Sequence, residues 1–490
     1  MYTIKLNEQF QRALIFQGGG SLGAYEAGAY KAFYELMVER DKQIGREDHP
    51  LFDIVAGTSI GAMNAAVLVS FVKEKKGWVG SPERLIEFWE YLATESIIEK
   101  IPGFAEWWNY LHHFNNDVAT GESARRYYST KRFILQGVPH VFSPYKTLED
   151  RRFFDPSNTW YLYSNEPLKK SLEKFAKFPI ATNYQEKEPR LLLVAVDVLE
   201  GATVVFDSYE KPDGTRKSEY GRYGAEFATG KGKAEDYEYV IRYNDGIEVD
   251  FVLASGSVPV NYDYTRLLVE EHKHEIDNDA AKVSQKENGL VTKKYRYFWD
   301  GGIIANTPLR EAVLEHKRYW HYVRKSRVPL LRAFIINVHP MVQYSLPTNY
   351  DGLVDRKNDL TYHDRTLFDE RVAIMVTDYV DIIERLVKLA KDNGVNKNLV
   401  DDLFKEQALS RNFMTGKHGT YEELAKNMPR MDLVFRIERK NDVHTIANKT
   451  FDFSITTIKQ LIKEGYEQAM DQGTKILQQW ILEHPKQNIK

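Results

Sequence analysis

A serine between two glycines stands where an apolar run, residues 51–56, gives way to a helical pattern. The motif reads GTSIG and spans residues 57–61. A tight turn from a strand into a helix exposes the serine oxygen, its glycines allow backbone and substrate to approach closely, and the helix amides point to where an oxyanion would form. The pattern predicts that Ser59 is a nucleophile at such a turn, which Gly57 and Gly61 make possible.

A second glycine-rich segment could supply the donors that this chemistry needs. A serine hydroxyl is a weak nucleophile, so it requires a base within hydrogen-bond reach and groups that stabilise the oxyanion. Residues 18–23 read GGGSLG and lie between the apolar run 12–17 and a helical pattern. Consecutive small residues before a helix let backbone amides converge on an anionic oxygen. We expect an oxyanion hole and its turn here, formed by Gly18, Gly19, Gly20, Ser21 and the structural Gly23.

Asp300 is the candidate base. The sequence WDGG at residues 299–302 ends a predicted strand at a further glycine corner, formed by Gly301 and Gly302. In open α/β sheets, sites form at the carboxyl ends of the strands. Asp300 is therefore expected at the rim of the sheet, facing Ser59.

His339 is an alternative base, because it follows a predicted strand that ends at residue 338. A conventional α/β-hydrolase takes its histidine from a late loop, in the chain order Ser, Asp, His. A structural or surface histidine is the other interpretation of His339. The sequence shows no H-E-x-x-H motif and no other pattern of metal ligands, so we expect neither a metal nor a nucleotide cofactor.

The elements that position these residues follow an α/β pattern. Two successive units of strand, glycine turn and helix, at residues 12–39 and 51–73, predict a parallel sheet. Further apolar runs predict strands at residues 190–196, 203–206, 295–299 and 333–338. Polar stretches at residues 210–238, 272–294 and 345–365 are expected to be surface insertions.

The C-terminal part, residues 366–490, is predicted to be mostly helical. One apolar stripe at helical spacing runs from Val372 to Leu389, and another runs from Ile455 to Ala469. Core packing is the expected explanation of both stripes, so neither receives a function.

Residues 101–182 form an aromatic-rich segment between the first strands and the later ones. An inserted cap over an apolar substrate site and an ordinary subdomain with a small core of its own are both compatible with this composition.

Composition narrows the classes of function. The chain has 490 residues, of which 43% are hydrophobic and 28% charged, and its net charge of -3 gives no basic excess that would favour a nucleic-acid partner. The absence of cysteine excludes disulfides and thiolate catalysis. We find no apolar stretch of the length of a signal peptide near the N-terminus or of a membrane helix anywhere, which predicts a cytoplasmic protein that visits a membrane surface transiently.

The three glycine motifs, in this order, resemble those of the patatin-like phospholipase family. Further matches are the sequence ASGSVP at residues 254–259, NTP at 306–308 and FDFS at 451–454, so the resemblance extends from about residue 12 to about 470. It implies one hydrolase domain over residues 10–470, a three-layer α/β/α sandwich with a mainly parallel central sheet, and a Ser-Asp dyad in place of a triad. The implied substrate is a lipid ester, a phospholipid or lysophospholipid. Many members carry Arg or Lys where this chain has Leu22, which puts the phospholipid preference in doubt.

Two alternatives stay open at this point. Residues 18–23 also satisfy G-x-G-x-x-G, the fingerprint of a dinucleotide-binding protein, but that fingerprint expects an acidic residue after a second strand about twenty positions on, and no strand precedes the acidic residues there. A non-catalytic, lipid-binding member of the family is expected to have lost its nucleophile, base or oxyanion glycines, and all of them are present.

Overall fold

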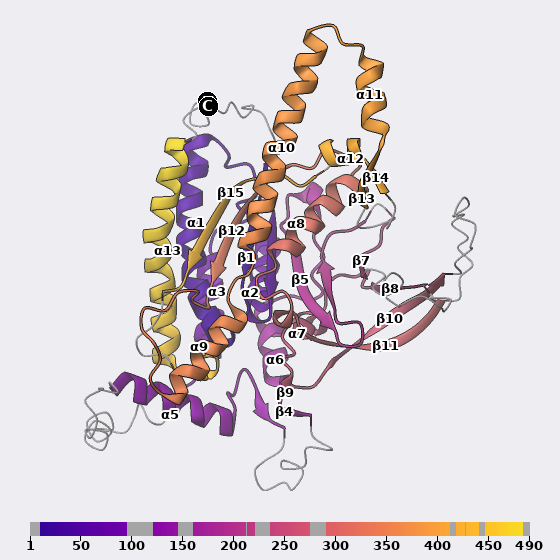
Figure 1. Ribbon diagram of the computed structural model, residues 1–490. Coiled ribbons are helices and arrows are strands. Elements are labelled where there is room, and N and C mark those ends of the chain that lie inside the picture. Colours follow the sequence, from indigo (N-terminus) through magenta and orange to yellow (C-terminus); the bar gives the residue numbers. More distant parts are fainter. Residues whose placement is uncertain are drawn as a thin grey trace.

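The computed structural model describes residues 10–95, 121–145, 160–211, 213–220, 236–274, 291–411, 418–426, 428–440 and 446–483. Within them a ten-stranded sheet crosses the molecule (Figure 1). Its first five strands are mutually parallel, in the order β15 (Met431–Glu438), β12 (Leu330–Asn337), β1 (Phe10–Phe16), β2 (Ile54–Thr58) and β5 (Arg190–Asp197). The other five are antiparallel to their neighbours: β6 (Ala202–Asp207), β11 (Val291–Asp300), β10 (Thr265–His274), β8 (Asp236–Arg242) and β7 (Lys217–Tyr220).

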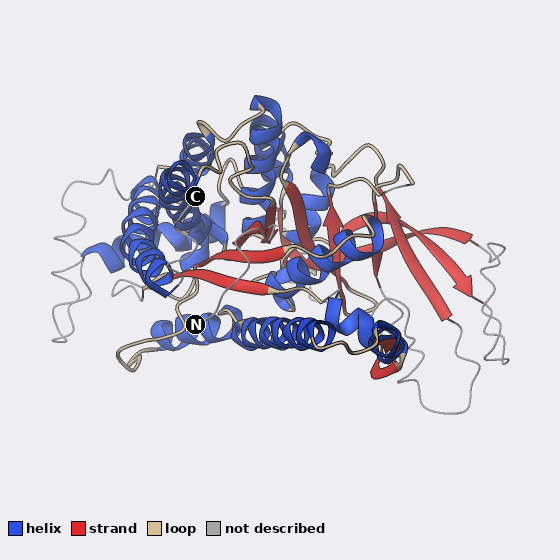
Figure 2. Cartoon of the chain, turned by 90° about the horizontal axis from the view of Figure 1, so that it is seen from above, coloured by secondary structure: helices blue, strands red, loops and turns tan. Residues whose placement is uncertain are grey.

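Helices cover both faces of the parallel strands, so the predicted three-layer α/β/α sandwich is confirmed (Figure 2). Alternate residues of a strand point to opposite faces. In β1, Leu14 and Phe16 enter the core beneath one helical layer, whereas Ala13 and Ile15 enter the core beneath the other. The first layer contains α1 (Gly23–Ile44), α2 (Ile60–Lys75), α3 (Ser81–Leu92), α6 (Glu166–Phe175), α7 (Val249–Ser255) and α13 (Ile455–Glu483). The second contains α8 (Leu309–Lys317) and α10 (Leu367–Asp392).

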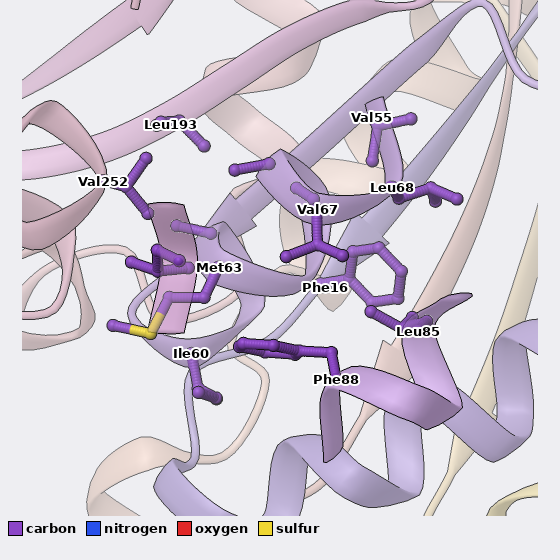
Figure 3. Close-up of a cluster of buried hydrophobic side chains, with 14 of the residues drawn as sticks. Phe16, Val55, Ile60, Met63, Val67, Leu68, Leu85, Phe88, Leu193 and Val252 are labelled. Carbon is purple, nitrogen blue, oxygen red and sulfur yellow. The ribbon is translucent and has the colours of Figure 1, made fainter. Parts of the chain in front are cut away.

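The larger core joins the nucleophile unit to the rest of the sheet. Figure 3 shows Phe16 and Val55 from the strands beside Val67 of α2 and Phe88 of α3, and all four side chains are buried. Because α2 begins at the residue after Ser59, this packing fixes the direction in which the nucleophile turn leaves the sheet.

The contact between α1 and α13 confirms the core interpretation of the second apolar stripe. Ile458 and Ala469 of α13 are fully buried. The two helices approach backbone to backbone, since a Cβ atom on Gly28 would lie 1.9 Å from the carbonyl oxygen of Ile462, and one on Gly465 would lie 2.0 Å from that of Tyr25. The C-terminal helix is thereby part of the larger hydrophobic core.

The same expectation is wrong for the stripe on α10. Only one side of this helix packs on the domain, through Ala373 and Val380, while Tyr379, Leu386 and Leu389 are 59%, 57% and 57% exposed. In Figure 1, α10 rises beyond the sheet and is followed by α11 (Lys397–Lys405), so no core is available to cover its outer side. No helix among the described residues is long and apolar enough to cross a membrane.

The polar stretches 210–238 and 272–294 contain residues of β7, β8, β10 and β11, which belong to the sheet. The prediction that they are only surface insertions missed this contribution. The long β10–β11 hairpin carries charged side chains that pair across strands: Glu270 binds Arg242 and Lys293, and Glu271 binds Lys294. Such charge pairs can stabilise an exposed hairpin whose sequence has no alternating apolar pattern. Residues 221–235 and 275–290 of these stretches lie outside the described residues. The third stretch contains α9 (Tyr350–Tyr362).

Of the aromatic-rich segment, residues 101–120 and 146–159 lie outside the described part. The remainder forms α5 (Gly121–Gln136) and a small sheet of β3 (Ser143–Pro144), β4 (Tyr161–Ser164) and β9 (Val260–Tyr262). Phe142 and Tyr163 are buried and their rings contact Phe451, whereas Trp160 is exposed. The cap function stays a prediction. The C-terminal part is completed by β13 (Gln407–Arg411), β14 (His418–Thr420) and α12 (Tyr421–Lys426).

Candidate active site

Ser59 directly follows β2, and Asp300 is the last residue of β11. Both strands pair with the same edge of β5. β2 runs parallel to β5 and places Thr58 opposite Val194, whereas β11 runs antiparallel and places Asp300 opposite Ala195, the next residue. The other edge of β5 is occupied by β6 over this length. The carboxyl ends of β2 and β11 therefore meet head to head, and the sheet itself brings the predicted nucleophile and base together.

The turn at Ser59 has the strained geometry expected of an exposed nucleophile. Its φ is 57° and its ψ is -126°, a conformation that costs a non-glycine residue about 1–3 kcal/mol. Close packing requires both glycines of the motif: a Cβ atom on Gly57 would lie 2.2 Å from the carbonyl oxygen of Gly61, and one on Gly61 would lie 2.6 Å from that of Phe16. The Ser59 amide donates to the Ser255 hydroxyl at 3.0 Å, which itself donates to the Val194 carbonyl at 2.5 Å.

Asp300 is buried at the end of its strand, where its amide donates to the Ser257 carbonyl at 2.9 Å. One carboxylate oxygen, Oδ1, accepts the amide of Gly302 at 2.6 Å. The other, Oδ2, is buried and has no hydrogen-bond partner among the described residues. Burial raises the pKa of Asp300 to about 7, although the nearby Ser59 hydroxyl and the Gly302 amide each lower it. A carboxyl group with this pKa is suited to act as a general base near neutral pH.

The close fit of Gly301 and Gly302 keeps this corner compact. A Cβ atom on Gly301 would lie 2.3 Å from the Val194 carbonyl oxygen, and one on Gly302 would lie 2.7 Å from Oδ1 of Asn306. A larger residue at Gly301 would therefore collide with the backbone of β5, whereas one at Gly302 would press on the side chains of Asn306 and Asp300.

The glycine-rich loop approaches the nucleophile from the end of β1. Gly18 lies against Ser59, since a Cβ atom there would come within 3.0 Å of the serine Cβ. Its amide donates to the Asn306 carbonyl at 3.1 Å, so it cannot also hold an oxyanion, in contrast to the prediction for Gly18. The amides of Gly19, Gly20 and Ser21 have no backbone acceptor in the described part of the chain. These three amides are therefore the available donors of the loop.

The side chain of Gln17 holds the start of the glycine-rich loop in place. Its Oε1 accepts the amides of Val338 and His339 at 2.8 and 3.0 Å, and its Nε2 donates to Thr307 at 2.9 Å. Gln17 thereby ties the strand before the loop to β12 and to the segment after Asp300. A glutamine at the end of an apolar strand is too common a feature to have predicted this role.

The far side of the loop rests on the C-terminal part of the chain. The Ser21 hydroxyl donates to the Lys449 carbonyl at 2.8 Å. This side chain therefore has a structural role. Gly20 has a φ of 58°, and a Cβ atom there would lie 2.5 Å from the Thr450 carbonyl oxygen. Leu22 is buried in the larger core.

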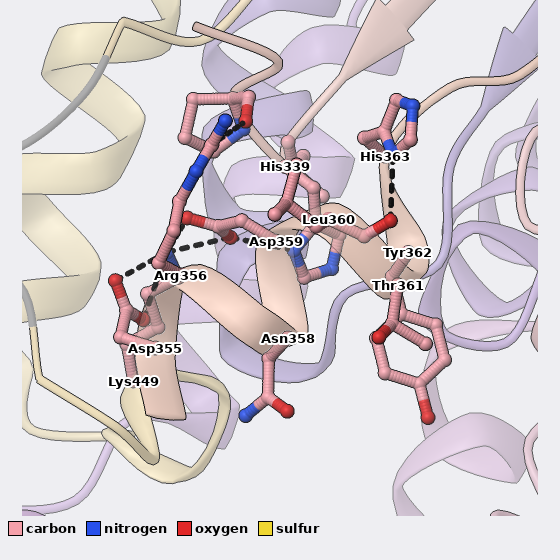
Figure 4. Close-up of polar contacts among 12 residues, drawn as sticks. His339, Asp355, Arg356, Asn358, Asp359, Leu360, Thr361, Tyr362, His363 and Lys449 are labelled. Atoms are coloured by element: carbon pink, nitrogen blue, oxygen red, sulfur yellow. Dashed lines mark hydrogen bonds and ion pairs between the residues drawn. The ribbon is translucent and has the colours of Figure 1, made fainter. Parts of the chain in front are cut away.

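His339 belongs to a buried polar cluster next to the loop (Figure 4). Its Nδ1 lies 3.1 Å from Oδ1 of Asp359, and Lys449 binds both Asp359 and Asp355 of α9. Burial lowers the pKa of His339 although Asp359 opposes this shift, which favours a neutral ring. The observed partner of His339 is thus a structural aspartate from α9, and the base alternative gains no support.

A buried carboxyl group behind the loop was not predicted. Glu26, in the first turn of α1, is fully buried and accepts the Asn64 amide at 2.8 Å, while the Trp89 indole donates to Asn64 at 2.9 Å. Burial raises the pKa of Glu26 well above its usual value, which favours the neutral carboxyl group. The only signal in the sequence is one carboxylate among small and apolar residues.

Comparisons with known proteins give three findings. A sequence model of a family described as patatin-like phospholipase matches residues 14–313. The crystal structure of VipD from Legionella pneumophila is similar at 13% sequence identity over 95% of this chain and 67% of that chain, with a TM-score of 0.28. A comparison with curated proteins found no match.

Proposed function

We propose that this chain, which belongs to the patatin-like phospholipase family, hydrolyses lipid esters with Ser59 as its nucleophile and Asp300 as its base. The family consists of esterases and phospholipases that act on lipid esters. The observation that carries the proposal for these two residues is the head-to-head approach of β2 and β11 along β5.

The reaction begins with the serine hydroxyl. Asp300 accepts the proton of Ser59 as its oxygen attacks the ester carbonyl, which gives a tetrahedral intermediate with a negative charge on the former carbonyl oxygen. The amides of Gly19, Gly20 and Ser21 stabilise this charge together with the N-terminus of α2, where the amide of Ile60 lies next to the nucleophile.

Collapse of the intermediate breaks the ester bond. Asp300 returns the proton to the leaving alcohol, and the acyl group stays on Ser59. A water molecule then gives one proton to Asp300 and attacks the acyl-enzyme. Asp300 passes this proton to the leaving Ser59 oxygen, which releases the fatty acid and restores both residues. No metal or nucleotide enters these steps.

A phospholipid or lysophospholipid is the proposed substrate. Leu22 contributes no positive charge beside the loop, so recognition of a phosphate must come from other residues than in relatives with a basic residue there. We also propose that the enzyme acts at a membrane surface and that the segment 101–182 covers the site until it meets one.

The alternatives have less support. In the dinucleotide alternative, an acidic residue at the end of a second strand should bind the ribose, whereas the next strand, β2, leads into the turn at Ser59 instead. A non-catalytic lipid-binding role does not explain the raised pKa of Asp300 or the strained turn at Ser59.

Assays of a phospholipid, a lysophospholipid, a triacylglycerol and p-nitrophenyl esters test the proposal. We expect turnover of at least one lipid ester by the natural chain and none by Ser59→Ala. Release of fatty acid at equal rates by both proteins would contradict the proposed chemistry. Equal rates on one substrate below and above its micelle threshold would contradict the cap.

A further inference from the structure

The outer side of α10 carries an apolar stripe with the spacing of a coiled coil. Its members alternate at distances of three and four residues, and they are Val372, Met375, Tyr379, Ile382, Leu386 and Leu389. All except Val372, which is half-buried, are exposed. Such a seam is narrow and matches a partner helix that crosses at a shallow angle.

The position of α10 on the domain leaves this seam facing outward. On the opposite side of the helix, the Thr377 hydroxyl is bonded to the backbone of Met431 in β15. Two acidic side chains on the domain side are paired within the chain, Glu384 with Arg327 and Asp381 with Arg430. The contacts with the domain thus use one side of the helix and leave the seam available.

We propose that α10 is the interface of a homodimer in which two copies of this helix pack antiparallel to each other. If Tyr379 of one copy lies opposite Ile382 of the second, then Met375 lies opposite Leu386 and Val372 opposite Leu389. Every seam residue in this range then has an apolar partner, and burial of the seam drives association.

The charges beside the seam select this arrangement. Arg371, Asp378, Arg385 and Asp392 are spaced seven residues apart, all are exposed, and their signs alternate. In the proposed register, Asp378 faces Arg385 of the second copy and Arg371 faces Asp392, and symmetry repeats both contacts. Each exposed pair adds little energy, but together they set the orientation and the register.

Other arrangements lose these contacts. A shift of one heptad in either direction makes like charges meet, either Asp378 with its own copy or Arg385 with its own copy. In a parallel pair, the same four side chains would face apolar positions such as Val376 and Ile383 instead of opposite charges. The pattern is therefore self-complementary in the antiparallel register alone.

A lipid surface is a less suitable partner for the seam. The exposed half of α10 and the following α11 lie at the end of the molecule opposite to α9, whose Asp359 contacts His339 beside the glycine-rich loop (Figure 1). A membrane bound there would not present substrate to Ser59. Membrane-binding helices also favour basic polar faces, whereas the charges here alternate.

Sedimentation velocity of the full chain over a dilution series tests the dimer. The natural chain should pass from monomer to a species of twice the mass as its concentration rises. Leu386→Glu should stay monomeric, because the introduced carboxylate would be buried against Met375 of the second copy. Lys388→Glu is the matched control, since it reverses an exposed charge away from the seam and should dimerise like the natural chain. Activity on a soluble ester should be unchanged in both variants, which shows that they are folded.

The register is tested by charge exchange. Asp378→Arg and Arg385→Asp should each weaken association about tenfold, whereas the double variant should regain it because opposite charges face each other again. The chain contains no cysteine, so introduced thiols give unambiguous crosslinks. A short bismaleimide should join Val372→Cys chains to Leu389→Cys chains, but not Leu389→Cys chains to one another.

Several results would overturn the proposal. They are a natural chain that is monomeric throughout the series, a Leu386→Glu variant that dimerises normally, and a crosslink between two Leu389→Cys chains, which would indicate a parallel pair. Flotation of the monomeric natural chain with phosphatidylglycerol vesicles, lost in Leu386→Glu, would assign the seam to a lipid surface instead. None of these outcomes depends on whether Ser59 is the nucleophile.

Discussion

Asp300 lies opposite Ala195 on the same edge of β5 on which Thr58, the residue before the nucleophile, lies opposite Val194. Hydrogen bonds of the sheet therefore set the separation of Ser59 and Asp300, and no flexible loop has to bring them together. The same arrangement buries the carboxyl group between strands, which is why its pKa is raised.

The rate of ester hydrolysis should rise with pH through about 7. Asp300 acts as a base only when it is ionised, and its pKa is raised to about 7 by burial. In Asp300→Asn this acidic limb should disappear, and kcat/KM should fall by at least about a hundredfold. A pH profile of kcat/KM on a soluble ester checks both statements. An acidic limb that persists in Asp300→Asn would assign it to another group.

The same pKa predicts that Asp300 destabilises the fold at alkaline pH. Because the folded-state pKa is above the unfolded value of about 3.9, the folded chain binds more protons between about pH 4 and 7, and stability falls as the pH rises through this window. Asp300→Asn removes this penalty, by up to about 4 kcal/mol above pH 7. Thermal melts should show a gain in Tm that is larger near pH 8 than near pH 5. An equal gain at both pH values would argue against the shifted carboxyl.

Ser255 is predicted to be a positioning residue for the nucleophile turn. Ser255→Ala removes the bridge between the Ser59 amide and the Val194 carbonyl, so kcat should fall about tenfold with little change in KM, at a stability cost of about 1–3 kcal/mol. Ser257→Ala is the matched control, because that hydroxyl binds Leu253 and Thr265 and not the turn. If both variants lose stability and neither loses kcat, Ser255 has only a structural role.

His339→Asn should keep most of the turnover and the acidic limb of the pH profile. The ring of His339 contacts Asp359, and Lys449 still neutralises that carboxylate when the ring is removed. The variant should melt at a lower temperature, because a buried contact is lost. A loss of activity as complete as that of Ser59→Ala, in a variant that is folded, would restore the triad.

Two placements in the site, the turn at Ser59 and the strand end at Asp300, can be read from residues that are adjacent in the sequence. A strand, a glycine corner and a helix can be recognised from adjacent residues, so the turn at Ser59 and the placement of Asp300 at a strand end were predictable. The supporting contacts were not, because they join distant segments: Ser255 to Ser59, Gln17 to Thr307, and Ser21 to Lys449. Consecutive glycines also do not reveal which amide is already bonded, as that of Gly18 is.

In the fold, too, local features were predictable and contacts between distant segments were not. Apolar periodicity predicted the parallel strands β1, β2, β5 and β12 and the buried stripe of α13. The fifth parallel strand, β15, was missed, because the C-terminal part was expected to be mostly helical. Periodicity could not show what covers a stripe, so Tyr379, Leu386 and Leu389 of the stripe on α10 were wrongly assigned to the core. The β10–β11 hairpin was missed because cross-strand charges such as Glu270 and Lys293, and not apolar side chains, accompany its pairing.

Labelling with a fluorophosphonate tests the central claim, that Ser59 is the nucleophile, most directly. The reagent reacts with an activated serine, so intact-mass measurement should show one adduct on the natural chain, and peptide mapping should place it on Ser59. We expect no adduct on Ser59→Ala, with a melting temperature at or near that of the natural chain, and slow labelling of Asp300→Asn. An adduct on Ser59→Ala, or labelling of the natural chain at another serine only, would contradict the proposed mechanism.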